Sequence, residues 1–137
     1  MYYLIIKYPQ LFRHCVAFSS AIYIDEQVIG FTNKEWNKRW GLLFGFDLVG
    51  KDRINGAFLD FRILELLQKS NIEALDESRF YLDSGDDDHL VIGNAKLQIL
   101  LKELNINHEF RVRNGGHNWT YWRTGLLDGL IYISETW

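Results

Sequence analysis

Three short apolar segments have the character of strands in a parallel sheet. Residues 15–18 are a continuous apolar run bounded by polar residues, a pattern typical of a strand covered on both faces, and residues 79–82 are predicted to form a second short strand. Residues 108–113 alternate instead, with Phe110 and Val112 on one face and charged side chains on the other. That alternation predicts a strand with one solvated face, near the edge of the sheet.

Predicted helices separate these strands. The first residues, 2–7, have the pattern of the end of a buried helix, which Tyr8-Pro9 terminates because the residue before a proline avoids helical angles. Apolar stripes at helical spacing then predict one helix over 59–67, one over 97–104 and a final one over 122–133. The stripes are Leu59, Ile63, Leu66 and Leu67; Leu97, Leu100, Leu101 and Leu104; and Trp122, Leu126, Leu130 and Ile133.

Residues 25–57 fit neither pattern. Gly41, Gly45, Gly50 and Gly56 interrupt the helical spacing there, so we expect an irregular, cap-like excursion of short helices. Trp36 and Trp40, four residues apart, share one helical face, and they either form a lid above the site or are buried in the core. With no internal repeat and no linker, residues 1–137 form a single domain. The order of elements predicts an α/β fold of about three parallel strands with flanking helices, joined by right-handed crossovers.

Composition excludes several classes of protein. A chain of 137 residues that is 47% hydrophobic is neither disordered nor fibrous. The formal net charge of −3 argues against a nucleic-acid partner, and the apolar runs are too short to span a membrane. The lone Cys15 forbids an internal disulfide.

Candidate chemistry lies in the loops that follow the strands, because ligands of parallel sheets bind beyond the carboxyl ends. These loops are Ser19-Ser20, the acidic residues 83–89 and Gly115-Gly116-His117. An aspartate of the second loop can orient the imidazole of His117, and the order acid before histidine is that of a hydrolase triad. A solvated acidic turn and a histidine that only packs against tryptophans are the alternatives.

Three motifs together resemble the "putative esterase" family of α/β-hydrolases, which includes S-formylglutathione hydrolase and the feruloyl, acetyl-xylan and enterochelin esterases. They are Lys7-Tyr8-Pro9-Gln10-Leu11-Phe12-Arg13 with the following Val16-Ala17-Phe18-Ser19-Ser20, then Asp83-Ser84-Gly85-Asp86-Asp87-Asp88, then Asn114-Gly115-Gly116-His117-Asn118-Trp119 with Trp122. The resemblance, over about residues 2–133, implies that Asp88 is the triad acid and His117 the general base.

The sequence departs from this family at the nucleophile, because no Gly-x-Ser-x-Gly occurs in it. The resemblance therefore implies the carboxyl-terminal half of a serine esterase, partial in fold, with the nucleophilic serine upstream of Met1 and little or no activity alone. The alternatives are a non-catalytic relative that binds carbohydrate or aryl groups through its tryptophans, and an enzyme with another nucleophile. Ser19 and Ser20 favour turn or capping roles, and Cys15 lies in an apolar strand where a thiol is inert.

Binding residues are predicted around the same loops. Trp119 and Trp122 flank His117 and can wall an acyl or aryl pocket, with Ser19 and Ser20 as further substrate-binding candidates. We expect no cofactor and no metal, because the acidic loop lacks EF-hand spacing and no sequence cluster completes a zinc set around His89.

The expected partner is a small-molecule or carbohydrate-linked ester, with no nucleic acid and no membrane. Loss of the neighbouring strands would expose apolar surface beside 15–18, which predicts a homo-oligomer or association through that face. The sequence leaves the ester and the compartment open; the cytoplasm is favoured, and any export signal would precede Met1.

Overall fold

The computed structural model describes residues 1–136 and contains one parallel sheet of three strands in the order β1-β2-β3. The strands are β1 (His14–Phe18), β2 (Arg79–Gly85) and β3 (His108–Arg113), and Leu82 pairs with Ala17 on one side and Phe110 on the other. The predicted parallel strands are confirmed. The boundary of β2 was predicted wrongly: residues 83–85 belong to the strand rather than to the acidic loop, because both neighbouring strands pair with this segment.

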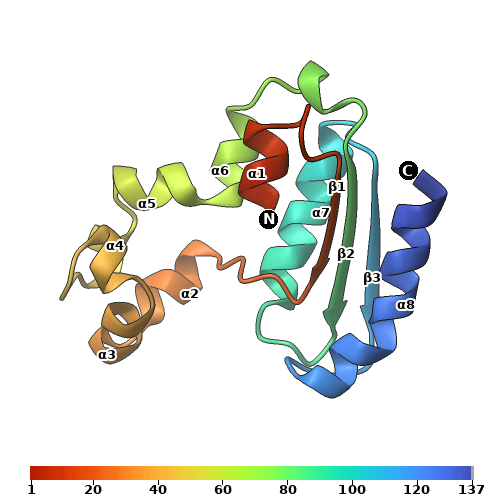
Figure 1. Ribbon diagram of the computed structural model, residues 1–137. Coiled ribbons are helices and arrows are strands. Elements are labelled where there is room, and N and C mark those ends of the chain that lie inside the picture. Colours follow the sequence, from red (N-terminus) through yellow and green to blue (C-terminus); the bar gives the residue numbers. More distant parts are fainter. Residues whose placement is uncertain (137) are drawn as a thin grey trace.

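Helices cover both faces of the sheet (Figure 1). On one face lie α1 (Tyr2–Lys7), α6 (Ile63–Gln68) and α7 (Val91–Glu103), and on the other lies α8 (Trp119–Thr136). The first layer encloses an aliphatic core that includes the fully buried Ile5, Leu67, Leu82, Leu97 and Leu101. Burial of each such side chain contributes about 1.5–3 kcal/mol, so this layer is the main stabilising unit.

The helix predicted over 59–67 is divided in two. Helix α5 (Gly56–Phe61) and helix α6 are separated by Arg62, whose backbone is extended with φ −72° and ψ 132°. The break has a packing reason: Phe58 of α5 is buried with the excursion, whereas Leu66 and Leu67 of α6 are buried against the sheet. One straight helix would not present side chains to both cores.

Residues 25–57 consist of short helices around a second, aromatic core. They form α2 (Asp25–Gly30), α3 (Asn33–Trp36), a π-helical turn (Asn37–Gly41), α4 (Leu42–Phe44) and a 3-10 turn (Gly50–Arg53); a further 3-10 turn (Glu73–Leu75) precedes β2. Trp36, Val28 and Phe58 are buried together there. Arg53, which is also buried, donates to the carbonyl oxygens of Val28 and Phe31 and links the short helices.

Helix α8 contacts the sheet through a different face from the one predicted. Leu126 and Leu130 of the expected stripe are half exposed, whereas Tyr121, Gly125 and Gly129 are buried. A Cβ on Gly129 would lie 2.7 Å from Cγ1 of Val16, so the helix approaches the sheet too closely for a larger side chain. The glycines determine the packed face, and the leucines point away from it. None of the helices among residues 1–136 has the length and apolar character of a membrane span.

Candidate catalytic site

The loops after β2 and β3 meet at the carboxyl edge of the sheet. The N–H groups of Asp86 and Asp87 donate to the carbonyl oxygens of Arg113 and Gly115, each over 3.0 Å. In return, the N–H of Gly115 donates to Oδ1 of Asp86 over 2.9 Å. These reciprocal hydrogen bonds hold the acidic loop and the Gly-Gly-His segment in a fixed relative position.

Two glycines make this close approach possible. A Cβ on Gly85 would lie 2.0 Å from the carbonyl oxygen of Gly115, closer than any side chain permits. Gly115 itself has φ 142°, in the region that favours glycine, and its Cα faces the ring of Tyr121. The sequence pattern Gly85 and Gly115-Gly116 therefore determines where His117 is placed.

Asp88 and His117 form the pair that the sequence predicted. Nδ1 of His117 lies 3.0 Å from Oδ2 of Asp88, whose side chain is fully buried. Burial opposes ionisation of Asp88, but hydrogen bonds from Ser19, the N–H of Leu90 and His117 outweigh it and hold the pKa of that carboxyl below its usual range. The predicted pairing is thus confirmed by distance, and Asp88 is ionised at neutral pH.

The ionised carboxylate determines the tautomer of His117. A carboxylate only accepts hydrogen bonds, so the proton on the facing Nδ1 leaves Nε2 as the basic nitrogen. The His117 side chain is 39% exposed, and the ring of Trp122 packs edge-on against it with centroids 4.9 Å apart. A buried acid, an oriented imidazole and solvent access together are suited to general base catalysis.

The hydroxyl of Ser19 contacts Asp88 rather than the ring of His117. Its side chain is buried, its φ is 49°, and its hydroxyl accepts from Nε1 of Trp122 over 3.0 Å while bonding to Asp88. Ser20 donates to the hydroxyl of Tyr2 over 3.2 Å. Neither hydroxyl is within hydrogen-bond distance of the His117 ring among the described residues, and the proposed contact of both serines with substrate stays a prediction.

The tryptophans separate into two groups. Trp119 is 73% exposed and packs on Trp122, beside His117, so both remain candidates for ligand contact. Trp36 is buried, and its Nε1 donates to the carbonyl oxygen of Gly45 over 2.8 Å. Of the two alternatives for Trp36, a lid or the core, the structure shows the core, because its side chain belongs to the aromatic cluster.

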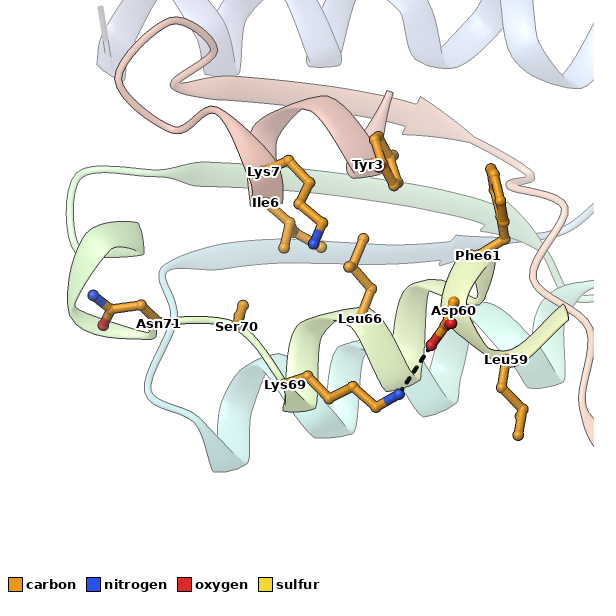
Figure 2. A pocket seen from close by; sticks show the side chains of 10 residues that line it. All are labelled: Tyr3, Ile6, Lys7, Leu59, Asp60, Phe61, Leu66, Lys69, Ser70 and Asn71. Atoms are coloured by element: carbon orange, nitrogen blue, oxygen red, sulfur yellow. Dashed lines mark hydrogen bonds and ion pairs between the residues drawn. The ribbon is translucent and has the colours of Figure 1, made fainter. Parts of the chain in front are cut away.

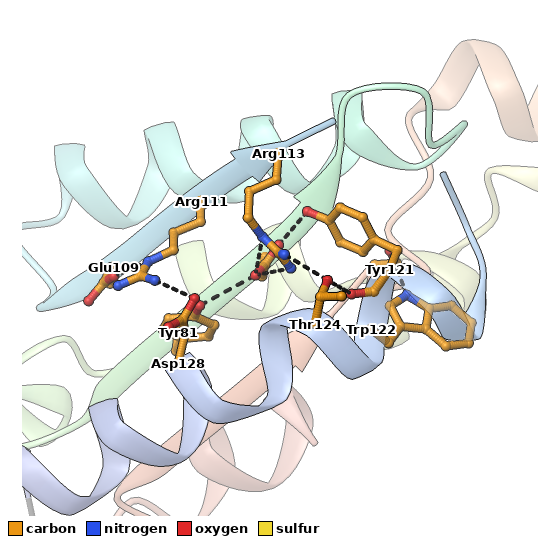
Figure 3. Close-up of polar contacts among 10 residues, drawn as sticks. Tyr81, Glu109, Arg111, Arg113, Tyr121, Trp122, Thr124 and Asp128 are labelled. Atoms are coloured by element: carbon orange, nitrogen blue, oxygen red, sulfur yellow. Dashed lines mark hydrogen bonds and ion pairs between the residues drawn. The ribbon is translucent and has the colours of Figure 1, made fainter. Parts of the chain in front are cut away.

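A buried polar cluster beneath the site was not anticipated from the sequence. Asp83, fully buried on β2, accepts from Nη2 of Arg113 over 2.8 Å and from the hydroxyl groups of Tyr81 and Tyr121 (Figure 3). Arg113 also donates to Thr124 over 3.0 Å. Burial and the neighbouring Asp83 raise the pKa of Tyr121, which keeps its donor proton. The cluster anchors the start of α8, and with it the loop that carries His117.

Two cavities differ in their relation to this site. One of about 420 Å³ lies between the sheet and the excursion and is lined by Ser20, Tyr23 and Trp40 among other, mostly apolar residues. Tyr23 connects it to the site, because its ring packs near His89, which packs near His117. The other, of about 510 Å³, lies between α1 and the α5–α6 segment near Lys7 and Lys69, and it shares Tyr3 and Phe61 with the first (Figure 2).

Comparison with known proteins agrees with this architecture. The chain matches the family described as "Putative esterase" over residues 2–133. A ferulic acid esterase structure superposes with a TM-score of 0.68 at 18% identity, covering 98% of this chain and 46% of that one. FphF, a fluorophosphonate-binding serine hydrolase of Staphylococcus aureus solved with substrate bound, superposes with a TM-score of 0.67 at 17% identity, covering 98% and 49%.

The chain thus spans about half the length of these solved structures, and no protein of curated function matches it. At such low identity the two structures support the fold, in which a parallel sheet carries flanking helices. The family match extends over nearly the whole chain and includes all three loops of the site. The chain is a member of the Putative esterase family.

Proposed function

We propose that this chain supplies the acid and the base of a carboxylic ester hydrolase, with Asp88 as the orienting acid and His117 as the general base. The observation that supports the proposal is the 3.0 Å contact between a fully buried carboxylate and a partly exposed imidazole at the carboxyl edge of the sheet. Family membership supplies the reaction class.

The geometry implies a defined order of proton transfers. Nε2 of His117 takes the proton of a hydroxyl nucleophile as that oxygen attacks the ester carbonyl, and then gives it to the departing alcohol. Asp88 stabilises the imidazolium that forms in between. Water repeats the sequence to release the acid product.

The nucleophile is proposed to lie outside residues 1–137. The sequence has no Gly-x-Ser-x-Gly, and the hydroxyl groups of Ser19, Ser20, Ser70 and Ser134 are engaged with groups other than His117. Burial raises the pKa of the Cys15 thiol to about 12, which leaves it inert. Without a nucleophile and an oxyanion hole, residues 1–137 alone are expected to be weakly active or inactive.

The missing group would be supplied by polypeptide that adds to the β1 edge. β1 is an edge strand among residues 1–136, and the leucines of α8 beside it are exposed. The matched structures are about twice as long as this chain, so the proposed occupant is a segment equivalent to their remaining half. Sedimentation of the isolated chain tests this: a stable monomer with no tendency to associate would contradict an unsatisfied edge.

The proposed substrate is a small-molecule or carbohydrate-linked ester with an apolar acyl or aryl group. The cavity of about 420 Å³ beside the site supports this, because it is lined mainly by aromatic and aliphatic side chains. Ester hydrolysis without a bound cofactor is consistent with acid–base chemistry at Asp88 and His117.

Hydrolysis of p-nitrophenyl acetate by the isolated chain tests the proposal. An activated ester can react with water through an imidazole base alone, so we expect slow turnover that falls to background in His117→Ala and weakens in Asp88→Asn. His108→Gln, a histidine on β3 away from the site, is the matched control and should keep the rate. Turnover above background that is equal in wild type and His117→Ala would contradict the proposed base.

A serine-directed fluorophosphonate tests the placement of the nucleophile. We expect no covalent labelling of residues 1–137, because none of their described serines is paired with His117. A labelled serine within this chain would contradict an external nucleophile.

The exposed indole of Trp119, stacked near Trp122, favours ligand binding without turnover as a second candidate function. Quenching of tryptophan fluorescence by an aryl glycoside, lost in Trp119→Ala and present without any ester hydrolysis, would support this candidate over the first.

A further inference from the structure

A third metal-ligating side chain lies against the Asp88–His117 pair. His89, which follows Asp88 in the loop, places Nδ1 3.4 Å from Oδ1 of Asp88, and its ring centroid is 5.3 Å from that of His117. One ligand atom from each of these three residues lies within 4.8 Å of the others. The acidic loop alone does not hold a full ligand set, and the fold adds His117 from another loop.

We propose that Asp88, His89 and His117 form a zinc-binding site. Zinc takes nitrogen and carboxylate ligands at about 2.0–2.2 Å in a tetrahedron, which sets neighbouring ligand atoms about 3.3 Å apart. Nδ1 of His117 lies 3.0 Å from Oδ2 of Asp88, and Nδ1 of His89 lies 3.4 Å from Oδ1, so each imidazole is at about this distance from one of the two carboxylate oxygens. Because the His89 side chain is 58% exposed, its ring can rotate to share one of these oxygens with His117.

The donor set selects the type of cation. Two imidazoles and one carboxylate favour zinc and similar transition metals, whereas calcium and magnesium prefer sites built from oxygen ligands. Three protein ligands leave a fourth position, which opens to solvent because both imidazole side chains are partly exposed.

Surrounding contacts orient the ligands. The buried carboxylate of Asp88 is held by the N–H of Leu90 over 2.9 Å and by the hydroxyl of Ser19. The backbone of His89 is also anchored, because its carbonyl oxygen accepts from Nε2 of Gln27 over 2.8 Å. Such supporting hydrogen bonds increase metal affinity by fixing ligands before the metal arrives.

Zinc binding and base catalysis exclude each other at this site. Zinc on Nδ1 of His117 displaces the Nδ1 proton, which otherwise forms the hydrogen bond to Asp88, and the neutral ring then carries its proton on Nε2. Nε2 is no longer a base, so zinc would act as a reversible inhibitor; this consequence, unlike the binding itself, rests on the proposed function.

Calorimetry with Zn²⁺ on the untagged chain tests the site without any measurement of turnover. We expect one zinc per chain, with affinity at least about tenfold weaker in His89→Gln, a loss comparable to the 10–100-fold cost of removing a supporting contact. His108→Gln is the matched control and should bind like the wild type. Circular dichroism of each variant checks that the fold is retained.

Co²⁺ provides an independent readout, because four-coordinate cobalt absorbs strongly in the visible region. The wild type and His108→Gln should show this absorption, and His89→Gln should lose it. Absence of zinc binding by the wild type, or equal binding by folded His89→Gln, would overturn the site and leave the proposed esterase function intact. Conversely, a failed hydrolysis test would leave these binding results unchanged.

Discussion

Helices α7 and α8 carry leucines at similar helical spacing, but these leucines occupy opposite environments. In α7, Leu97, Leu100 and Leu101 are buried against the sheet. In α8, Leu126 and Leu130 are half exposed, and glycines occupy the packed face. In these two helices, apolar periodicity identifies the helix itself. It identifies the buried face only where no smaller residue occupies the contact with the sheet.

The two helices also differ in what they cover. α7 packs on aliphatic side chains, for which the gain is simple burial. α8 lies over charged groups, because Asp83 and Arg113 point toward it and each would be closer than 3.0 Å to a Cβ at Gly125. On this side of the sheet, polar contacts are therefore combined with a close approach of the α8 backbone to the strands. The candidate site lies at the carboxyl edge of the sheet, next to the start of α8.

The largest expected effect is on the α7 side. Leu101→Ala should lower the free energy of unfolding by about 2–5 kcal/mol, because it opens a cavity in the aliphatic core. Leu130→Ala in α8 is the matched control and should change it by no more than about 0.5 kcal/mol. Urea unfolding measures both, and equal losses would show that the two leucine stripes are buried alike.

A second substitution tests the glycine contact of α8. Gly125→Ala should destabilise by about 1–3 kcal/mol through overpacking, because the new methyl group meets the Arg113 guanidinium at 2.3 Å. Gly30→Ala in α2, where nothing lies within 4 Å, is the control and should be neutral or stabilising. A stable Gly125→Ala would mean that α8 lies further from the sheet.

The polar cluster should show an effect of comparable size. Tyr121→Phe removes one donor to the buried carboxylate of Asp83 and should cost about 1–3 kcal/mol, since the charge remains buried. Tyr8→Phe, at an exposed position, should cost less than about 0.5 kcal/mol. Thermal unfolding compares the stability of the two variants. A Tyr121→Phe variant as stable as the wild type would show that the cluster does not anchor α8.

The smallest effect is the pH dependence contributed by the site. The pKa of Asp88 is lower when folded than when unfolded, so its ionisation stabilises the fold above the ordinary aspartate pKa of about 3.9. That contribution is lost as the pH falls through the folded pKa. The stability difference between wild type and Asp88→Asn should therefore shrink in acid, and a difference that grows in acid would contradict the direction of the shift.

Much of the fold follows from local pattern. The strands and the α7 stripe are visible as short apolar segments, and the loops that carry Asp88 and His117 are identified by their place after parallel strands. The extent of β2 could not be predicted, because Asp83 in a strand interior is stabilised by Arg113 and Tyr121, which are distant in sequence. The break at Arg62 could not be predicted either, because the apolar residues on its two sides pack into two different cores.

The candidate site shows the same division. The pairing of Asp88 with His117 follows from topology, since both lie at one edge of the sheet. The support from Ser19 and Trp122 does not, because the hydroxyl has to turn inward through a left-handed backbone at φ 49°. The contact of His89 with His117 depends on how two loops pack against each other, and the spacing of residues within either loop does not predict it.

The tautomer of His117 can be read by long-range ¹H–¹⁵N NMR of the four histidines in the metal-free chain, with assignment through His117→Ala. We expect neutral His117 to carry its proton on Nδ1, facing Asp88, and this preference to disappear in Asp88→Asn. A neutral His117 protonated on Nε2 in the wild type would contradict the proposed general base, because that ring could not accept a proton from a nucleophile.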